Sequence, residues 1–142
     1  MKGLKALSVL PDTLKTPAVR RTIRRAVEFL LLHRVYRSSH HPGRIARSGW
    51  ASFGFPNMWN TDALEILDIL TRLDIRDDRT QQAVDLVKKK QTSDGCWNLN
   101  HTWNGKMLVD IETNGRPSKW TTLSALRVLR HYHGTKVLPA AN

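Results

Sequence analysis

Apolar side chains recur at helical spacing in several segments of the chain. Thr16 can cap the start of a helix, and Pro17 suits the first helical position. Apolar residues then follow at helical intervals: Val19, Ile23, Ala26, Val27 and Leu30. This pattern predicts an amphipathic helix over residues 16–33. Comparable patterns predict four more helices, over residues 2–10, 61–73, 79–90 and 121–133, the last of them stopped by Gly134.

The predicted helices differ in how much of their circumference is apolar. Over residues 61–73, apolar side chains cover most of the surface: Ala63, Ile66, Leu67, Ile69, Leu70 and Leu73. Over residues 16–33, charged side chains lie opposite the apolar stripe: Arg20, Arg21, Arg24, Arg25 and Glu28. We therefore expect deeply buried helices to alternate with half-exposed ones. Runs of alternating β-branched residues are few, so the predicted fold class is all-α.

Two sequence patterns repeat along the chain. The pattern "ALSVL" at residues 6–10 returns as "ALEIL" at 63–67 and "ALRVL" at 125–129. Between these copies lie "AVEFLLLHR" at residues 26–34 and "AVDLVKKKQ" at 83–91. Two interleaved patterns with nearly the same period indicate a repeated pair of helices. We predict a single partial domain over residues 1–142, made of a half repeat (1–15) and two repeats (16–76 and 77–142).

A motif follows the second copy of the half-exposed helix. It consists of Gln91, Asp94, Gly95 and Trp97 and resembles the glutamine–tryptophan repeat of squalene and oxidosqualene cyclases, which protein prenyltransferase β-subunits share more loosely. In that family the motif lies where an outer helix of an α/α toroid turns toward an inner helix. Gly permits a left-handed turn there, and Trp can cover the turn. The resemblance implies an incomplete α/α toroid of about two and a half helix-hairpin repeats.

The cyclase resemblance implies a catalytic Asp directly before an inner helix, and the matching positions hold no acid. Trp59 and Asn60 precede one inner helix, and Trp120 precedes the next. The earlier repeat also departs from the motif, with Arg34 in place of Gln. The implied function is therefore that of a prenyltransferase-like or squalene cyclase-like protein, either a C-terminal fragment or a degenerate member, which lacks its own catalytic acid and handles an isoprenoid-type hydrophobic ligand.

Three residues near the predicted inner helices are candidates for a ligand cavity. Asp62, in the first turn of residues 61–73, could act as an acid or could interact with the helix N-terminus. Trp59 and Trp120 hold equivalent places before two inner helices, as cavity walls or as packing anchors. Two and a half repeats cannot enclose a cavity, so we expect self-association or a partner that completes the toroid.

The prenyltransferase resemblance also implies a zinc site made of Asp-x-Cys and a distant His. Asp94 and Cys96, with His131 or His133, carry the same ligand atoms. In that family the Asp-x-Cys pair directly precedes an inner helix, whereas here it lies inside the turn between Gln91 and Trp97. We therefore predict neither a metal nor another cofactor.

Charge suggests a second function. The net charge is +11, and residues 1–50 hold 11 Lys or Arg against two acidic residues. A field of this kind attracts anionic partners. The alternative function is therefore a non-enzymatic helical repeat module that binds an anionic membrane surface or a polynucleotide. Its candidate contacts are Arg20, Arg21, Arg24 and Arg25, which could also form a simply solvated face.

Sequence features also bear on localisation. The longest apolar run has four residues, 29–32, far below the roughly 20 needed to cross a bilayer. The apolar stretch near the start is too short for a signal peptide, and a single Cys agrees with a reducing compartment. We predict a cytoplasmic protein that can lie at a membrane surface.

Overall fold

The computed structural model describes residues 1–41 and 43–133. In these residues it contains five α-helices, three short 3-10 helices and no strand. The elements follow in the order α1 (Lys2–Ser8), η1 (Asp12–Leu14), α2 (Pro17–Leu32), η2 (Ser48–Ala51), α3 (Ala63–Arg72), η3 (Asp78–Thr80), α4 (Gln81–Lys89) and α5 (Lys119–His133). The predicted all-α class is confirmed for this part of the chain.

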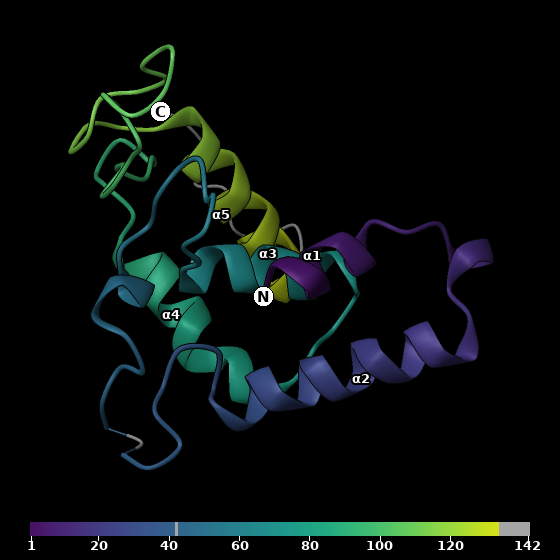
Figure 1. Cartoon of the computed structure of the whole chain (residues 1–142). Coiled ribbons are helices and arrows are strands. Elements are labelled where there is room, and N and C mark those ends of the chain that lie inside the picture. The colour runs from purple at the N-terminus through teal and green to yellow at the C-terminus, as the bar shows by residue number, and fades with distance from the viewer. Residues whose placement is uncertain (42, 134–142) are drawn as a thin grey trace.

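Helix α3 lies at the centre of the arrangement (Figure 1). It contacts α1, α4 and α5, and all its residues from 63 to 70 are buried. Helix α2 buries only one stripe, formed by Val27, Leu30 and Leu31, and contacts α1 and η3. In Figure 1, α5, α3 and α1 follow one another from left to right, and α2 runs below them. The core is therefore built around α3.

The five predicted helices are present, and their boundaries have local causes. Thr16 is the N-cap of α2, and its side chain accepts a hydrogen bond from the Val19 amide. Helix α3 begins two residues later than predicted, because the Asp62 side chain caps it by accepting a bond from the Glu65 amide. A 3-10 turn, η3, precedes α4 and is capped by Asp77. The predicted stop at Gly134 lies outside the described residues.

The expectation that every inner helix is deeply buried is wrong for two of the three. Helix α1 buries only Leu4 and Ser8. Helix α5 buries a single stripe formed by Thr121, Ala125, Val128 and Leu129. Helix α3 is buried all round, since it contacts α1, α4 and α5. The position of each helix within the fold, rather than the shared ALxxL pattern, therefore determines how much of it is buried.

The turn after α4 has the geometry that its sequence predicts. Gly95 has a φ of +76°, and the Gln91 side-chain amide donates a 3.1 Å hydrogen bond to the Gly95 carbonyl. Trp97 is fully buried, and its indole N–H donates a 2.7 Å bond to the Val87 carbonyl of α4. The backbone N–H of Trp97 also donates to the Thr122 hydroxyl of α5 at 3.0 Å. Trp97 therefore joins the turn to both helices.

Substitution of Trp97 tests this joining role. Trp97→Ala should lower the free energy of unfolding by about 4 kcal/mol, because it opens a large cavity and leaves the Val87 carbonyl without its donor. Trp50→Ala is the matched control, since Trp50 is only partly buried at the edge of the core. Urea unfolding measures both changes. An equal loss in the two variants would contradict the assigned role of Trp97.

Candidate functional site

Two regions of the structure gather polar and charged side chains. The first is a hollow of about 130 Å³ along α3, here called the α3 hollow. Its walls come from α1, the segment 54–57, α3 and α5, and they include Lys5, Phe55, Asp62, Glu65, Asp68 and Trp120. The second region is the exposed side of α2. Each contains residues that the sequence marked as candidates.

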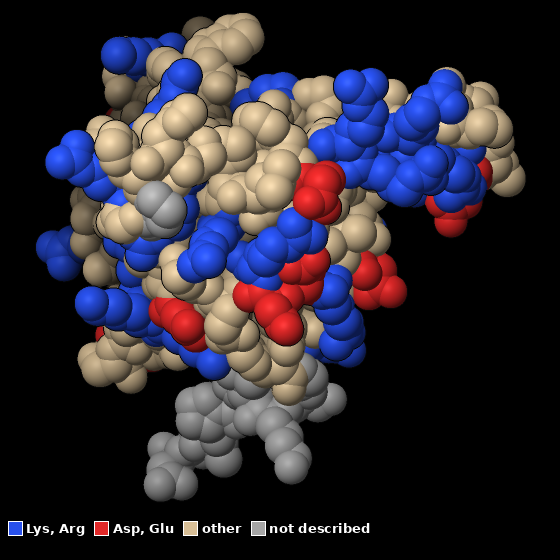
Figure 2. Space-filling view, turned by 90° about the horizontal axis from the view of Figure 1, so that it is seen from below, with Lys and Arg blue, Asp and Glu red and all other residues tan. Residues whose placement is uncertain are grey.

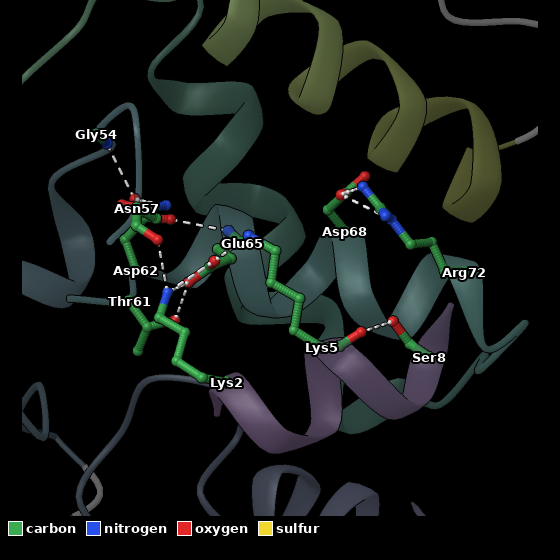
Figure 3. A network of polar contacts seen from close by, with 10 residues as sticks. All are labelled: Lys2, Lys5, Ser8, Gly54, Asn57, Thr61, Asp62, Glu65, Asp68 and Arg72. Carbon is green, nitrogen blue, oxygen red and sulfur yellow. Dashed lines mark hydrogen bonds and ion pairs between the residues drawn. The ribbon is translucent and has the colours of Figure 1, made fainter. Parts of the chain in front are cut away.

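Asp62 fixes the entry to α3. It is 1% exposed, and its carboxylate accepts hydrogen bonds from the Glu65 amide at 2.8 Å and the Gly54 amide at 3.0 Å. A third bond comes from the Asn57 side chain at 3.2 Å (Figure 3). Burial raises the pKa of Asp62, and these three bonds oppose the rise. The carboxylate therefore caps the helix and holds the 54–57 segment against it.

Glu65 is the strongest electrostatic link in the hollow. It is 8% exposed, and its carboxylate accepts bonds from the ammonium groups of Lys2 at 2.9 Å and Lys5 at 2.8 Å. The Thr61 hydroxyl donates a further bond at 2.6 Å (Figure 3). Burial favours the neutral acid, but the bonds from Lys5, Thr61 and Lys2 outweigh burial and lower the pKa of Glu65. An ionised Glu65 therefore ties α1 to α3.

Asp68 provides a similar link on the next turn of α3. Its carboxylate accepts bonds from Arg72 at 2.7 Å and from Arg127 of α5 at 2.8 Å. Asp62, Glu65 and Asp68 thus line the hollow at intervals of three residues on one helix. Sequence reasoning selected only Asp62. Acids at three-residue spacing in an otherwise apolar helix were the available signal, since buried acids need partners.

The two tryptophans expected to be equivalent have different environments. Trp120 borders the hollow and stacks on Phe55, with ring centroids 5.1 Å apart and an interplanar angle of 13°. Trp59 is 85% exposed and does not line the hollow. The expected equivalence is therefore wrong. Asp62 holds segment 54–57 inward, and residues 58–60, which connect it to α3, are left exposed.

The residues considered for a zinc site lie in two different elements of the structure. Asp94 and Cys96 lie in the turn after α4, whereas His131 lies on α5 and its Nε2 is 3.2 Å from the Ile75 carbonyl. Burial and the charge of Lys88 lower the pKa of His133. Among the described residues, no group of three or more His, Cys, Asp or Glu side chains could hold a metal ion.

The second region is the α2 outer face, defined as Arg21, Arg24, Arg25, Phe29 and Leu32. All five residues are exposed. The three arginines form no ion pair within residues 1–41 and 43–133, and Figure 2 shows Lys and Arg gathered over the projecting part of the molecule to which α2 belongs. This face therefore presents charge that its own surroundings do not neutralise.

Arg20 differs from the other predicted anion contacts. Its guanidinium donates bonds to the backbone carbonyls of Lys15 at 3.1 Å and Asp12 at 3.2 Å. It also lies 4.0 Å from the Asp12 carboxylate. Arg20 therefore holds the η1 segment against α2, and the expectation that all four arginines form one free face is wrong for this residue.

The acid of α2 is neutralised from another element. Glu28 accepts two bonds from the Arg79 guanidinium, at 2.7 and 3.1 Å. This hydrogen bonding lowers the pKa of Glu28. The same guanidinium also pairs with Asp77 at 2.8 Å, so Glu28, Arg79 and Asp77 form one cluster beside α2.

Comparison of the chain with protein-family models, with curated proteins and with solved structures finds no match. Within the described residues, no helix is long and apolar enough to cross a membrane. The function of the protein is therefore proposed from the arrangement of its own side chains.

The Glu65 link predicts a pH-dependent loss of stability. Glu65→Gln should lower the free energy of unfolding at pH 7 by about 2 kcal/mol, because two ammonium groups lose a charged acceptor. Glu65 stabilises the fold above its ordinary pKa of 4.5, and this contribution is lost as pH falls through the lowered folded-state pKa. The difference between wild type and variant should therefore shrink below about pH 4.5.

Urea unfolding across this pH range measures the effect. Asp12→Asn is the control, because Asp12 forms an exposed ion pair with Lys15 and should change stability little at any pH. A wild-type advantage over Glu65→Gln that stays constant with pH would contradict the assigned ionisation.

Proposed function

We propose that this protein is a helical module that binds an anionic partner through the α2 outer face. The observation that carries the proposal is the set of three exposed arginines, at positions 21, 24 and 25, that form no ion pair within the described part of the chain. Such a concentration of like charge does not stabilise the fold, because the guanidinium groups repel one another. A phosphate-bearing partner would relieve that repulsion and accept their hydrogen bonds.

Two features around α2 keep its outer face available. The opposite side of the helix packs into the core through Val27, Leu30 and Leu31, so the helix has a fixed orientation. Glu28 is directed into a bond with Arg79 and does not cover the arginines. The face is thus held rigidly outward, which lowers the entropic cost of binding.

A second candidate function is the handling of an isoprenoid-type ligand by a toroid-type repeat protein. The specific observation in its favour is the α3 hollow, where buried Asp62 lies near the stacked Phe55 and Trp120 rings. The hollow measures about 130 Å³, below the ~300 Å³ at which ligand pockets usually begin. This candidate therefore requires a second copy or a partner chain to complete the toroid, and it ranks below anion binding.

A matched pair of charge variants tests the first proposal. Arg21, Arg24 and Arg25 are replaced together by Gln, and the control replaces Lys88, Lys89 and Arg130, which are exposed on α4 and α5. Both triple variants remove the same charge. The α2 variant should bind anionic vesicles and polynucleotide tenfold or more weakly, on the order of 1 kcal/mol per cation, and wild-type binding should fall with salt.

The location of the charge decides the outcome of this test. Equal weakening in both triple variants would mean that net charge alone causes binding, and the α2 site would be rejected. Arg20 is left unchanged in both because it holds η1 in place. Thermal unfolding should be nearly the same for wild type and both variants, since all six positions are on the surface.

Ligand binding tests the second candidate. A polyprenyl diphosphate or a polyprene should bind saturably, and Trp120→Ala should weaken that binding because Trp120 borders the hollow. Trp59→Ala is the control, since Trp59 is outside the hollow and 85% exposed. Calorimetric titration measures both. Loss of binding in the Trp59 variant alone, or no binding by wild type, would exclude the hollow as an isoprenoid site.

A further inference from the structure

The α2 outer face exposes large apolar side chains among its arginines. Phe29 is 58% exposed and Leu32 is 63% exposed. Arg21, Arg25 and Phe29 are spaced four residues apart, and Leu32 lies three residues beyond Phe29. Residues three and four apart lie on the same side of a helix. Arg21 and Arg25 therefore share one surface with the two apolar side chains, and Arg24, three residues after Arg21, lies at its edge.

The exposure of Phe29 and Leu32 is not explained by packing within the fold. Their neighbours Leu30 and Leu31 are buried and supply the contacts between this end of α2 and the core. The Phe29 ring packs against the His33 ring, with centroids 4.4 Å apart and planes inclined by 40°. This contact covers only part of the Phe29 side chain, which stays 58% exposed. Apolar surface of this size beside cations calls for a partner that offers both anionic groups and an apolar interior.

We propose that the α2 outer face binds the surface of an anionic lipid bilayer, with its arginines on lipid phosphates and with Phe29 and Leu32 inserted between the headgroups. This inference rests on the proposed anion-binding function and names its partner. A helix with a basic side and bulky apolar side chains lies along the membrane plane and does not span it. The length of α2, 16 residues, and its buried inner stripe agree with that orientation.

The apolar residues distinguish lipid from nucleic acid. A polynucleotide could neutralise the arginines and could stack a base on Phe29. It would leave Leu32 in water, because an aliphatic side chain has no ring on which a base can stack. A bilayer accommodates both side chains and also accepts the hydrogen bonds of the arginines. Figure 1 and Figure 2 show α2 extending from the body of the molecule, so a flat surface can approach it.

The test uses the full chain and vesicles of phosphatidylcholine with and without phosphatidylglycerol. We expect binding only to the anionic vesicles. Phe29→Gln with Leu32→Gln should weaken vesicle binding tenfold or more, since each exposed side chain loses its transfer out of water. Leu108→Gln with Val109→Gln is the control, because these side chains are 104% and 68% exposed on a loop before α5. The control should bind like wild type.

A single-stranded polynucleotide serves as the competing probe. If the Phe29 and Leu32 variant binds vesicles as wild type does, while the arginine variant loses binding, the anionic module stands and the lipid inference is overturned. The same conclusion follows if wild type binds the polynucleotide and not the vesicles. If the arginine variant keeps full binding to both probes, the proposed function itself fails.

A fluorescent probe gives a second readout that does not depend on affinity. Leu32→Cys in a Cys96→Ser background can carry an environment-sensitive fluorophore, and Leu108→Cys provides the matched label on another surface. The emission of the label at position 32 should shift to the blue when anionic vesicles are added, because it enters an apolar layer. The label at position 108 should not shift. A shift at position 108 alone would place the membrane on the wrong side of the molecule and overturn the inference.

Discussion

The structure depends on the placement of three acids in an otherwise apolar helix. A buried carboxylate is costly unless charged or hydrogen-bonding partners surround it. On α3, Asp62 obtains backbone and side-chain donors from the 54–57 segment, Glu65 obtains two lysines from α1, and Asp68 obtains an arginine from α5. Each acid thus fixes a different segment against α3. The apolar side chains supply most of the driving force, and the acids select which segments lie where.

This organisation separates the interior of the molecule from α2. The cations that approach α3 are neutralised in pairs, as in the links of Glu65 with Lys2 and Lys5. The arginines of the α2 outer face lie on the far side of a helix whose inner stripe is already packed. Positive charge therefore has two roles in one chain. Near α3 it stabilises the fold, and on the outside of α2 it remains available for a partner.

Much of the helical framework could be predicted from the sequence, because helix periodicity, the Thr16 cap and the left-handed Gly95 are local properties. The candidate site could be predicted only in part. The sequence places Trp59 and Trp120 at equivalent positions, and only the bonds of Asp62 to Gly54 and Asn57 show why one is exposed. Such differences arise from the hydrogen bonds that a particular loop forms with the start of a helix, which a repeat pattern does not encode.

The sequence also could not show which arginines of α2 are free of contacts within the fold. Four arginines have the same sequence signature, but Arg20 lies close enough to η1 to bond the carbonyl of Asp12 in η1 and that of Lys15, which follows it. The apolar residues on that helix were also ambiguous, since a run of four from Phe29 includes two that are buried and two that are exposed. Side-chain direction around the helix, fixed by the core contacts of Leu30 and Leu31, divides that run into a buried pair and an exposed pair.

The two proposed functions do not compete for the same surface. The α3 hollow is lined by residues of α1, the segment 54–57, α3 and α5, and none of its lining residues belongs to α2. A hydrophobic ligand that dissolves in membranes would reach such a protein most directly at a bilayer surface, because its concentration in water is low. Membrane binding through Arg21, Arg25, Phe29 and Leu32 would therefore be compatible both with isoprenoid handling and with a purely structural role. Ligand binding in the α3 hollow is the property that would distinguish these two roles.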